Sequence, residues 1–186
     1  YIPFASVDDT CRDISVTCIA PTKTFNLAGL QTAAVYAENS ILHHRMWRQL
    51  NTDEVAEPNA FAIQATIAAF QYGEEWLDEL REYVEKNKQY VTEFLQEKIP
   101  LIHPVAGDAT YLMWLDCRKI TESGRQFVKF IRKTSGLYVS GGNQYGRGGE
   151  GFLRVNVATS KLVVEDGMQR LYESVDAWLK EEKISK

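Results

Sequence analysis

Two basic side chains stand in settings where they could do chemistry, and the first is Lys23. It lies in Pro21-Thr22-Lys23-Thr24, after residues 14–20, whose β-branched, small and largely apolar side chains predict a buried strand that Pro21 ends. Residues 27–30, Leu-Ala-Gly-Leu, are expected to return the chain to the core. An amine held between two buried segments would be partly desolvated and nucleophilic toward a carbonyl carbon. An ordinary solvated loop lysine is the alternative, since most lysines are exposed.

The second basic side chain is Arg154, in a strand predicted over residues 152–157. The side chains of that strand alternate between two faces, with Leu153, Val155 and Val157 on one and Phe152, Arg154 and Asn156 on the other. A guanidinium presents a planar fork of donors that matches a carboxylate, such as the α-carboxylate of an amino acid. An exposed strand arginine without a ligand is the alternative.

The first half of the chain is predicted to supply the elements around Lys23. We expect a loop or short helix over 1–13, strands over 14–20 and 30–37, a helix from Ile41 to about Leu50 capped by Ser40, and a helix over 60–72 capped by Asn59. The helix over 60–72 is apolar on nearly all sides and is therefore expected to be buried. Residues 74–98 follow as a long amphipathic helix, within which we place the change of domain.

The second half predicts a small sheet covered by helices on one side, as in an α+β lobe. The expected strands are 110–116, 137–139 and 152–157, and the expected helices are 122–134 and 161–182. In the last helix, the side chains predicted to face inward are Leu162, Met168, Leu171, Val175 and Leu179.

Composition narrows the class of protein. The 186 residues carry a formal net charge of −4, so there is no basic footprint for nucleic acid, and no apolar run approaches the length of a membrane span. Cys11, Cys18 and Cys117 form an odd set without paired metal-ligand spacing, and we expect reduced thiols, with Cys18 and Cys117 in strands, and a cytoplasmic protein. The neighbouring His43 and His44 have no third ligand and are expected at the surface rather than on a metal.

Two separate motifs carry a resemblance to a known family. Residues 21–31, Pro-Thr-Lys-Thr-Phe-Asn-Leu-Ala-Gly-Leu-Gln, resemble the Schiff-base lysine segment of pyridoxal-phosphate (PLP) enzymes in the class I/II aminotransferase superfamily, fold-type I. Within it the segment looks most like the branch of cystathionine β-lyase type C–S lyases. Residues 151–158, Gly-Phe-Leu-Arg-Val-Asn-Val-Ala, resemble the carboxylate-binding arginine segment of the same family. The order and separation of the two motifs also fit, and the similarity runs from Tyr1 to the last helix.

The resemblance implies an α/β fold-type I transferase of which this chain is the C-terminal part. Residues 1–72 would be the tail end of the large PLP-binding domain, 73–98 a long linking helix, and 99–186 the small C-terminal α/β domain. Members of the family are about twice as long, so most of the cofactor pocket is expected to precede Tyr1. We therefore expect this chain alone to hold PLP weakly or not at all and to be catalytically inactive.

The resemblance also implies roles for single residues. Lys23 would form the imine with PLP and move protons at the substrate Cα, and Arg154 would bind the substrate carboxylate. Thr22 would either donate to the cofactor phosphate or satisfy the loop backbone, and these two readings stay open. Ala20 departs from the family pattern, because many aminotransferases have a phosphate-binding serine there. Asp8, Asp9 and Asp13 lie too close to Lys23 in the family order to be the aspartate that holds the pyridine nitrogen protonated.

The glycine-rich residues 141–151 resemble the family's loop between two small-domain strands near the substrate entrance. They lack the lysine-hydroxyl ending of a phosphate-binding P-loop. A flexible connector is favoured over a substrate contact through Tyr145 or Arg147.

The function implied is β-elimination at an amino acid with sulfur at Cβ, releasing thiol, pyruvate and ammonia, within amino-acid metabolism. A PLP-dependent aminotransferase of the same fold is the close alternative, and a regulatory protein-binding lobe is a third reading from another class. The full-length form would be a homodimer. The shortened chain is expected to expose apolar surface in residues 1–60 and to associate with itself.

Overall fold

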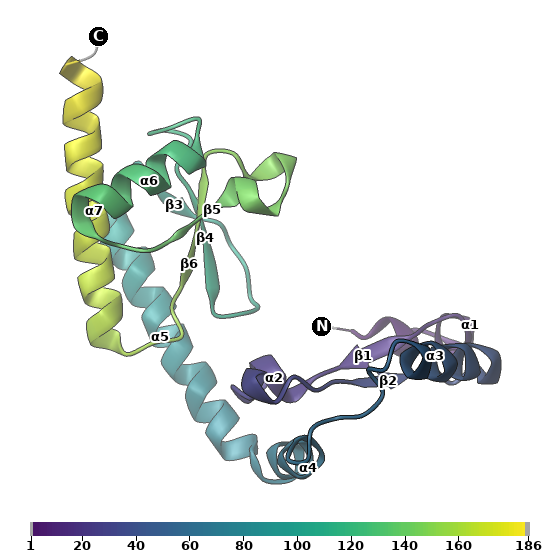
Figure 1. Ribbon diagram of the computed structural model, residues 1–186. Coiled ribbons are helices and arrows are strands. Elements are labelled where there is room, and N and C mark those ends of the chain that lie inside the picture. Colours follow the sequence, from purple (N-terminus) through teal and green to yellow (C-terminus); the bar gives the residue numbers. More distant parts are fainter. Residues whose placement is uncertain (1, 185–186) are drawn as a thin grey trace. The chain divides into compact units, whose positions relative to one another are not determined.

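The computed structural model describes residues 2–184 and divides the chain into two compact units, Tyr1–Glu79 and Leu80–Lys186 (Figure 1). We call them the N-terminal and the C-terminal unit. The division falls within one long helix, α5 (Glu74–Lys98), whose bounds agree with the helix predicted over 74–98. The relative position of the two units is not determined, so each is described separately. The assignment of 1–72, 73–98 and 99–186 to parts of a PLP enzyme stays a prediction.

The N-terminal unit is a chain of short elements around a two-stranded sheet. In order they are η1 (Phe4–Ser6), α1 (Asp9–Asp13), β1 (Thr17–Ile19), α2 (Pro21–Thr24), η2 (Ala28–Leu30), β2 (Ala34–Tyr36), α3 (Ser40–Thr52) and α4 (Ala62–Tyr72). The strands β1 and β2 pair antiparallel, with Cys18 opposite Val35. Both are shorter than the predicted strands over 14–20 and 30–37. Residues 28–30 instead form a turn that closes on Gln31 in the left-handed region, at φ 49°, which no regular strand includes.

Burial in the N-terminal unit is the main correction to the sequence analysis. In residues 14–20, predicted to be a buried strand, Ile14 is 63% exposed and Ile19 is 51% exposed. The helix α4 was also predicted to be buried, but Ala62 is its one buried residue. Pro21, Ala37 and Ala62 are the buried residues among those described in this unit. Two short strands and short helices offer too little covering surface to enclose the apolar side chains they carry.

Two helices begin one or two residues away from the predicted positions, and of the two only α3 has a side-chain cap at its N-cap residue; the N-cap of α4 is Phe61, not the predicted Asn59. The N-cap of α3 is Asn39 rather than Ser40, because its Oδ1 accepts hydrogen bonds from the backbone N–H of Ile41 and Leu42, at 2.9 and 3.1 Å. Asn59 Oδ1 accepts from the N–H of Phe61 at 3.0 Å, and α4 begins after that residue.

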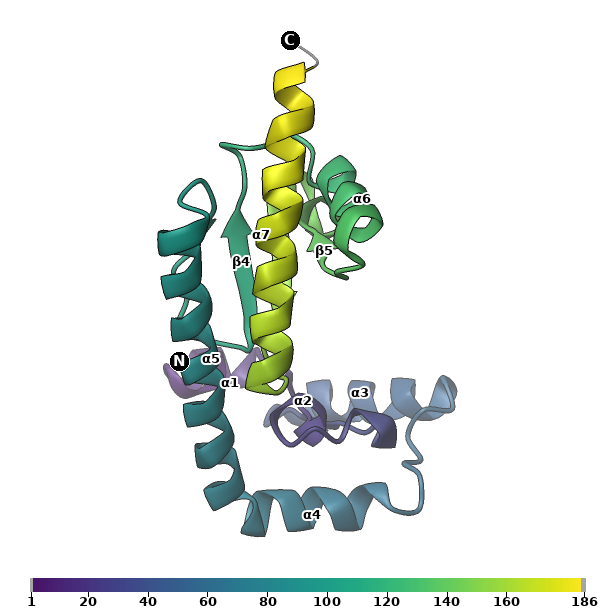
Figure 2. The same ribbon diagram turned by 90° about the vertical axis from the view of Figure 1, so that its left-hand side faces the viewer.

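The C-terminal unit is a four-stranded antiparallel sheet with three helices on one face. The strand order is β3 (His103–Pro104), β4 (Leu112–Asp116), β6 (Phe152–Asn156) and β5 (Ser140–Gly141). Figure 2 shows α7 (Lys161–Ile184) lying along the sheet, with the 80–98 part of α5 and α6 (Gly124–Ser135) on either side. The α+β lobe predicted from the sequence is confirmed. The strand predicted over 137–139 lies instead at 140–141, where Ser140 pairs with Arg154.

One continuous core holds this unit together. It contains Val91 and Leu95 of α5, Phe127 and Ile131 of α6, Met113, Leu115, Leu153 and Val155 of the sheet, and Met168, Leu171 and Val175 of α7. Asn87, also buried, donates from Nδ2 to the carbonyls of Val157 and Thr159 at 2.9 and 3.0 Å, which joins α5 to the end of β6.

The inward face of α7 differs from the prediction at one position. Leu162 is 76% exposed, whereas Val164, Met168, Leu171 and Val175 are buried and Leu179 is half-buried. The buried residues are three or four positions apart, so they share one face. Leu162 precedes Val164 by two residues, which is about 200° around a helix and therefore on the opposite side.

Candidate functional site

Lys23 lies in the four-residue helix α2, directly after β1. Pro21 opens that helix and is buried, and the N–H of Phe25 closes it by donating to the Pro21 carbonyl at 2.9 Å. The side chain of Lys23 is exposed. The prediction that Lys23 is desolvated between two buried segments is wrong for this chain, because residues 14–20 and 27–30 are themselves exposed or half-buried.

Thr22 and Lys23 both keep their side-chain polar groups free within the described part of the chain. There the Lys23 amine makes no ion pair or hydrogen bond, and the half-buried Thr22 hydroxyl has no hydrogen-bond partner. The Thr22 carbonyl, not the hydroxyl, satisfies the loop by accepting from the N–H of Leu27 at 3.0 Å. Both side chains can therefore reach a ligand without breaking an internal contact.

The three aspartates that precede Lys23 are each engaged elsewhere. Asp8 caps α1 by accepting from the N–H of Cys11 at 2.7 Å, and this hydrogen bond lowers the pKa of Asp8. Asp9 pairs with Arg12 at 3.2 Å, and Asp13 accepts from Asn39 Nδ2 at 2.9 Å. That none of the three is the aspartate that holds the pyridine nitrogen protonated stays a prediction.

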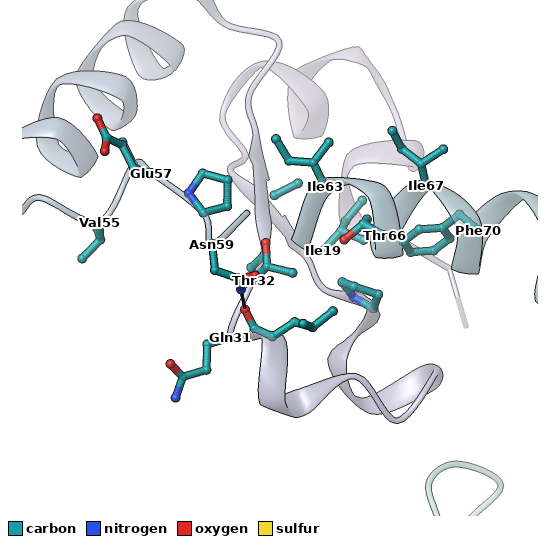
Figure 3. A pocket seen from close by; sticks show the side chains of 16 residues that line it. Ile19, Gln31, Thr32, Val55, Glu57, Asn59, Ile63, Thr66, Ile67 and Phe70 are labelled. Carbon is teal, nitrogen blue, oxygen red and sulfur yellow. Dashed lines mark hydrogen bonds between the residues drawn. The ribbon is translucent and has the colours of Figure 1, made fainter. Parts of the chain in front are cut away.

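A groove of about 710 Å³ adjoins the same region of the N-terminal unit (Figure 3). Its walls come from β1, η2, β2, residues 55–59 and α4, and Asn59 Nδ2 bridges two of them by donating to the Leu30 carbonyl. Ile63, Ile67 and Phe70 project into it from one face of α4. This groove was not predicted from the sequence, although the spacing of those three residues indicates that they share one apolar face of the helix. Glu57 is the one ionisable residue on its lining, and neither Lys23 nor Thr22 lies on it, so the groove offers apolar contact rather than acid–base chemistry.

Arg154 lies in β6 on the open face of the sheet, the face that the helices do not cover. The alternation predicted for this strand is confirmed, since Leu153, Val155 and Val157 are buried and Arg154 is half-buried on the other side. Its register partner on β4 is Trp114, and Asp116 stands opposite Phe152 in the same way.

Aromatic rings surround Arg154 on that face. Its guanidinium carbon lies 4.6 Å from the centre of the Tyr145 ring, and Tyr145 meets Trp114 edge-on at 5.7 Å between ring centres. Trp114 in turn stacks on Phe152 at 5.6 Å. The sequence analysis did not assign Trp114, although its place in an alternating strand could have shown that it shares a face with Asp116.

A second arginine on this side of the sheet has an acidic partner. Arg118 donates to both carboxylate oxygens of Asp116, at 2.9 and 2.6 Å, and these bonds lower the pKa of Asp116 to about 2. Its guanidinium also lies 4.9 Å above the Phe152 ring. The guanidinium of Arg154, by contrast, makes neither a hydrogen bond nor an ion pair with any side chain of residues 2–181 or with the backbone of residues 2–184. Arg154 therefore has all of its N–H donors available for an anion, whereas Arg118 already directs two of its donors to a carboxylate.

The glycine-rich residues between β5 and β6 fold into two 3-10 turns, η3 (Gly142–Tyr145) and η4 (Arg147–Gly149), which pack on each other. A Cβ placed on Gly149 would lie 1.9 Å from the Gly142 carbonyl oxygen, so only glycine fits there. The loop joins the strands β5 and β6, and residues 144–148 of it are exposed, so a flexible connector stays a prediction.

The histidines and cysteines considered in the sequence analysis form no metal site in the part of the chain that the structure describes. His43 and His44 are exposed as predicted, and residues 2–184 contain no group of three His, Cys, Asp or Glu side chains arranged for a metal. All three cysteines are free; Cys117 is buried just after β4, and Cys18 is exposed in β1. No helix in the described range is long and apolar enough to cross a membrane. The structure places Thr22 and Lys23 together in one unit and Arg154 in the other, without placing the two units relative to each other.

Comparison with known proteins assigns the family. The model of the family "Aminotransferase class I and II" matches residues 6–171, a range that contains both Lys23 and Arg154. Cystathionine beta-lyase PatB of Bacillus subtilis is 39% identical over 171 residues, which are 92% of this chain and 44% of that protein. The chain thus spans about half the length of the curated relatives it matches, as the resemblance implied.

Solved structures agree with the fold. A PLP-bound putative aminotransferase from Clostridium difficile 630 matches 94% of this chain and 45% of its own, with a TM-score of 0.91 and 28% identity. A PLP-bound C–S lyase from Staphylococcus hominis matches 88% of this chain and 42% of its own, with a TM-score of 0.76 and 30% identity. The predicted fold-type I class and the predicted resemblance to the C–S lyase branch are therefore confirmed. The chain belongs to the aminotransferase class I and II family.

Proposed function

We propose that this chain is the part of a PLP-dependent C–S lyase that carries the cofactor-binding lysine, Lys23, and the carboxylate-binding arginine, Arg154. The observation that carries the proposal is that the family match contains both residues and that each keeps its cationic group free of acidic partners in the described chain. The similarity to PatB of Bacillus subtilis and to the C–S lyase of Staphylococcus hominis supports a lyase.

The residues present fit PLP in part. Lys23 offers an exposed primary amine, the one side-chain group that forms an imine with an aldehyde, and the adjacent Thr22 offers a free hydroxyl for the phosphate. Ala20, at the N-cap of α2, adds no side-chain donor, and Asp8, Asp9 and Asp13 are engaged elsewhere. The donor set thus suits covalent attachment and one phosphate contact. We expect PLP to bind this chain weakly.

The chemistry divides among a few groups. PLP, when bound, supplies an electron sink for the electrons released at the substrate Cα. Arg154 binds the α-carboxylate through its planar fork and thereby orients the Cα–H bond. Lys23 removes the proton from Cα, after which the thiolate leaves Cβ and takes up a proton to give the thiol. Water hydrolyses the released aminoacrylate, through its imine form, to pyruvate and ammonia. The substrate class is an amino acid with sulfur at Cβ, and the full-length protein is a cytoplasmic homodimer.

The first test is chemical labelling of the chain as it stands. We would titrate it with PLP, reduce with borohydride and map the pyridoxyl group by mass spectrometry, with Lys23→Arg as the variant and Lys86→Arg as the matched control. Lys86 is an exposed lysine of α5 that is paired at 3.9 Å with Glu82. Preferential labelling at Lys23, lost in Lys23→Arg only, is expected. Equal labelling of Lys23 and Lys86 would contradict the assignment.

The second test separates the lyase from the aminotransferase. The chain alone is expected to release no pyruvate from cystathionine. Mixed with the part of the Bacillus subtilis relative that the match leaves uncovered, it should release pyruvate without a keto-acid acceptor, and Lys23→Arg should abolish that release. Turnover that depends on an added keto acid would show an aminotransferase instead.

A further inference from the structure

We propose that Tyr145 is a positioning residue that holds the Arg154 guanidinium on the open face of the sheet in the orientation that accepts a carboxylate. The inference rests on the proposed role of Arg154 and deepens it by naming the group that orients the arginine.

The geometry of the pair supports this role. The guanidinium carbon lies 4.6 Å from the centre of the Tyr145 ring, well inside the range of about 6 Å over which a cation is attracted to a ring face. Tyr145 also contacts Trp114, the register partner of Arg154 on β4. The ring therefore touches both members of one cross-strand pair, which limits the conformations open to the arginine.

The mode of contact leaves the binding edge of Arg154 free. A cation–π contact is an attraction between the positive charge and the face of the ring and takes up no hydrogen-bond acceptor, whereas a carboxylate binds to the guanidinium through its N–H donors. Among the side chains described, those of residues 2–181, and the backbone of residues 2–184, no group accepts a hydrogen bond from those donors. The ring can therefore orient the group without competing with a ligand for its hydrogen bonds.

Arg118 shows the same arrangement with its carboxylate supplied by the chain. Its guanidinium lies 4.9 Å above the Phe152 ring while its edge binds both oxygens of Asp116. Two arginines on this side of the sheet thus each lie over an aromatic ring and have N–H donors for a carboxylate. Arg118 uses its edge for Asp116, and Arg154 has the ring but no acidic partner among the described residues.

The loop that carries Tyr145 is built to hold the ring in place. Tyr145 ends η3, and the close approach of Gly142 to Gly149 packs η3 against η4. The next residue, Gly146, has a φ of 120°, which side-chain-bearing residues rarely adopt. The packing of the two turns therefore restricts the backbone that carries the ring.

The test uses nuclear magnetic resonance on the whole chain, read at the Nε–Hε signal of Arg154 during titration with L-alanine. The variants are Tyr145→Leu, which removes the ring, and Tyr145→Phe, which keeps it. Tyr138→Leu is the matched control, because Tyr138 lies 4.9 Å from the guanidinium of Arg132 elsewhere in the unit. The dispersion of the backbone amide signals reports folding for each variant.

We expect Tyr145→Leu to shift the Arg154 Hε signal downfield and to lower the order parameter of that group. The Kd for L-alanine should rise about two- to five-fold, which corresponds to the loss of one exposed cation–π contact. Tyr145→Phe should behave as wild type, and Tyr138→Leu should leave Arg154 unchanged. Unchanged Arg154 signals and affinity in Tyr145→Leu would overturn the inference. If the wild type does not bind L-alanine at all, the proposed role of Arg154 fails in this chain. The positioning inference is then decided by the Hε shift and order parameter alone.

Discussion

The two units of this chain differ in what they do with their apolar residues. In the C-terminal unit eighteen buried apolar residues from the sheet, three helices and the segments that join them form one cluster. In the N-terminal unit Pro21, Ala37 and Ala62 are the buried residues among those described, and side chains as large as Trp47, Phe61 and Phe70 are more than half exposed. Both units are rich in apolar residues, so the difference lies in whether another element covers them.

The exposed apolar surface confirms one expectation and leaves another open. Residues 1–60 expose apolar side chains as predicted, among them Ile2, Phe4, Ile14 and Trp47. Patches of this kind mark surfaces that bind another protein or promote association. Self-association stays a prediction. The surface does not by itself distinguish the enzyme from the regulatory binding lobe.

The largest effect should come from a core truncation in the C-terminal unit set against a matched one in the N-terminal unit. Leu153→Ala removes a fully buried side chain and should lower the free energy of unfolding of its unit by about 2–5 kcal/mol. Ile19→Ala, at a strand position that is 51% exposed, should change stability by no more than about 0.5 kcal/mol. Urea denaturation followed by circular dichroism measures both. Equal losses would show that the N-terminal unit buries Ile19 in solution.

The rates at which the cysteines of the two units react with an alkylating reagent compare the packing of the units without any mutation. Burial raises the pKa of Cys117 to about 12, so its thiol stays protonated, and burial also keeps a reagent away from it. Cys18, in contrast, is exposed in β1. Because the thiolate is the reactive form, an alkylating reagent at pH 8 should modify Cys18 at least about a hundred-fold faster than Cys117. Peptide mass mapping over time gives both rates. Labelling of Cys117 at a rate close to that of Cys18 in the absence of denaturant would show that the C-terminal core opens readily.

Self-association should depend on the N-terminal unit alone. Phe70→Ser, on the exposed wall of the groove, should weaken association by about ten- to a hundred-fold, since burying one phenylalanine contributes about 1.5–3 kcal/mol. Tyr138→Ser, at a 75% exposed aromatic residue of the C-terminal unit, is the control and should have no effect. Light scattering across a concentration series measures the association. Monomeric wild-type protein at high concentration would rule it out.

The smallest expected change in stability concerns the ion pair of Asp116 and Arg118 on the open face of the C-terminal sheet. The Arg118 hydrogen bonds lower the pKa of Asp116 to about 2, against about 3.9 in an unfolded chain. The stabilisation is therefore fully present above about pH 4 and is lost as the pH falls towards 2. Because the pair is partly exposed, it should amount to less than about 1 kcal/mol. Asp116→Asn should be less stable than wild type at pH 6, and the gap should close near pH 2; a gap independent of pH would contradict this assignment. Asp108→Asn, at an exposed loop position, is the control.

The features that the sequence determined by itself are local ones, namely the bounds of elements and the faces of single strands. The bounds of α5, the alternation of β6 and the position of Lys23 just after a strand follow from apolar periodicity and from proline, which act within a few neighbouring residues. The two family motifs were likewise readable, because each is a short run of residues.

Only the tertiary structure decided which apolar residues are covered and what surrounds Arg154. Residues 14–20 and 60–72 carry the pattern of buried elements, yet burial needs a second surface, and no sequence pattern states whether one is present. Tyr145 and Trp114 meet Arg154 from a loop and from a neighbouring strand, through the register of β4 with β6 and the turn of the glycine-rich loop. Contacts between distant segments depend on how the strands pair, and that pairing is a property of the folded chain.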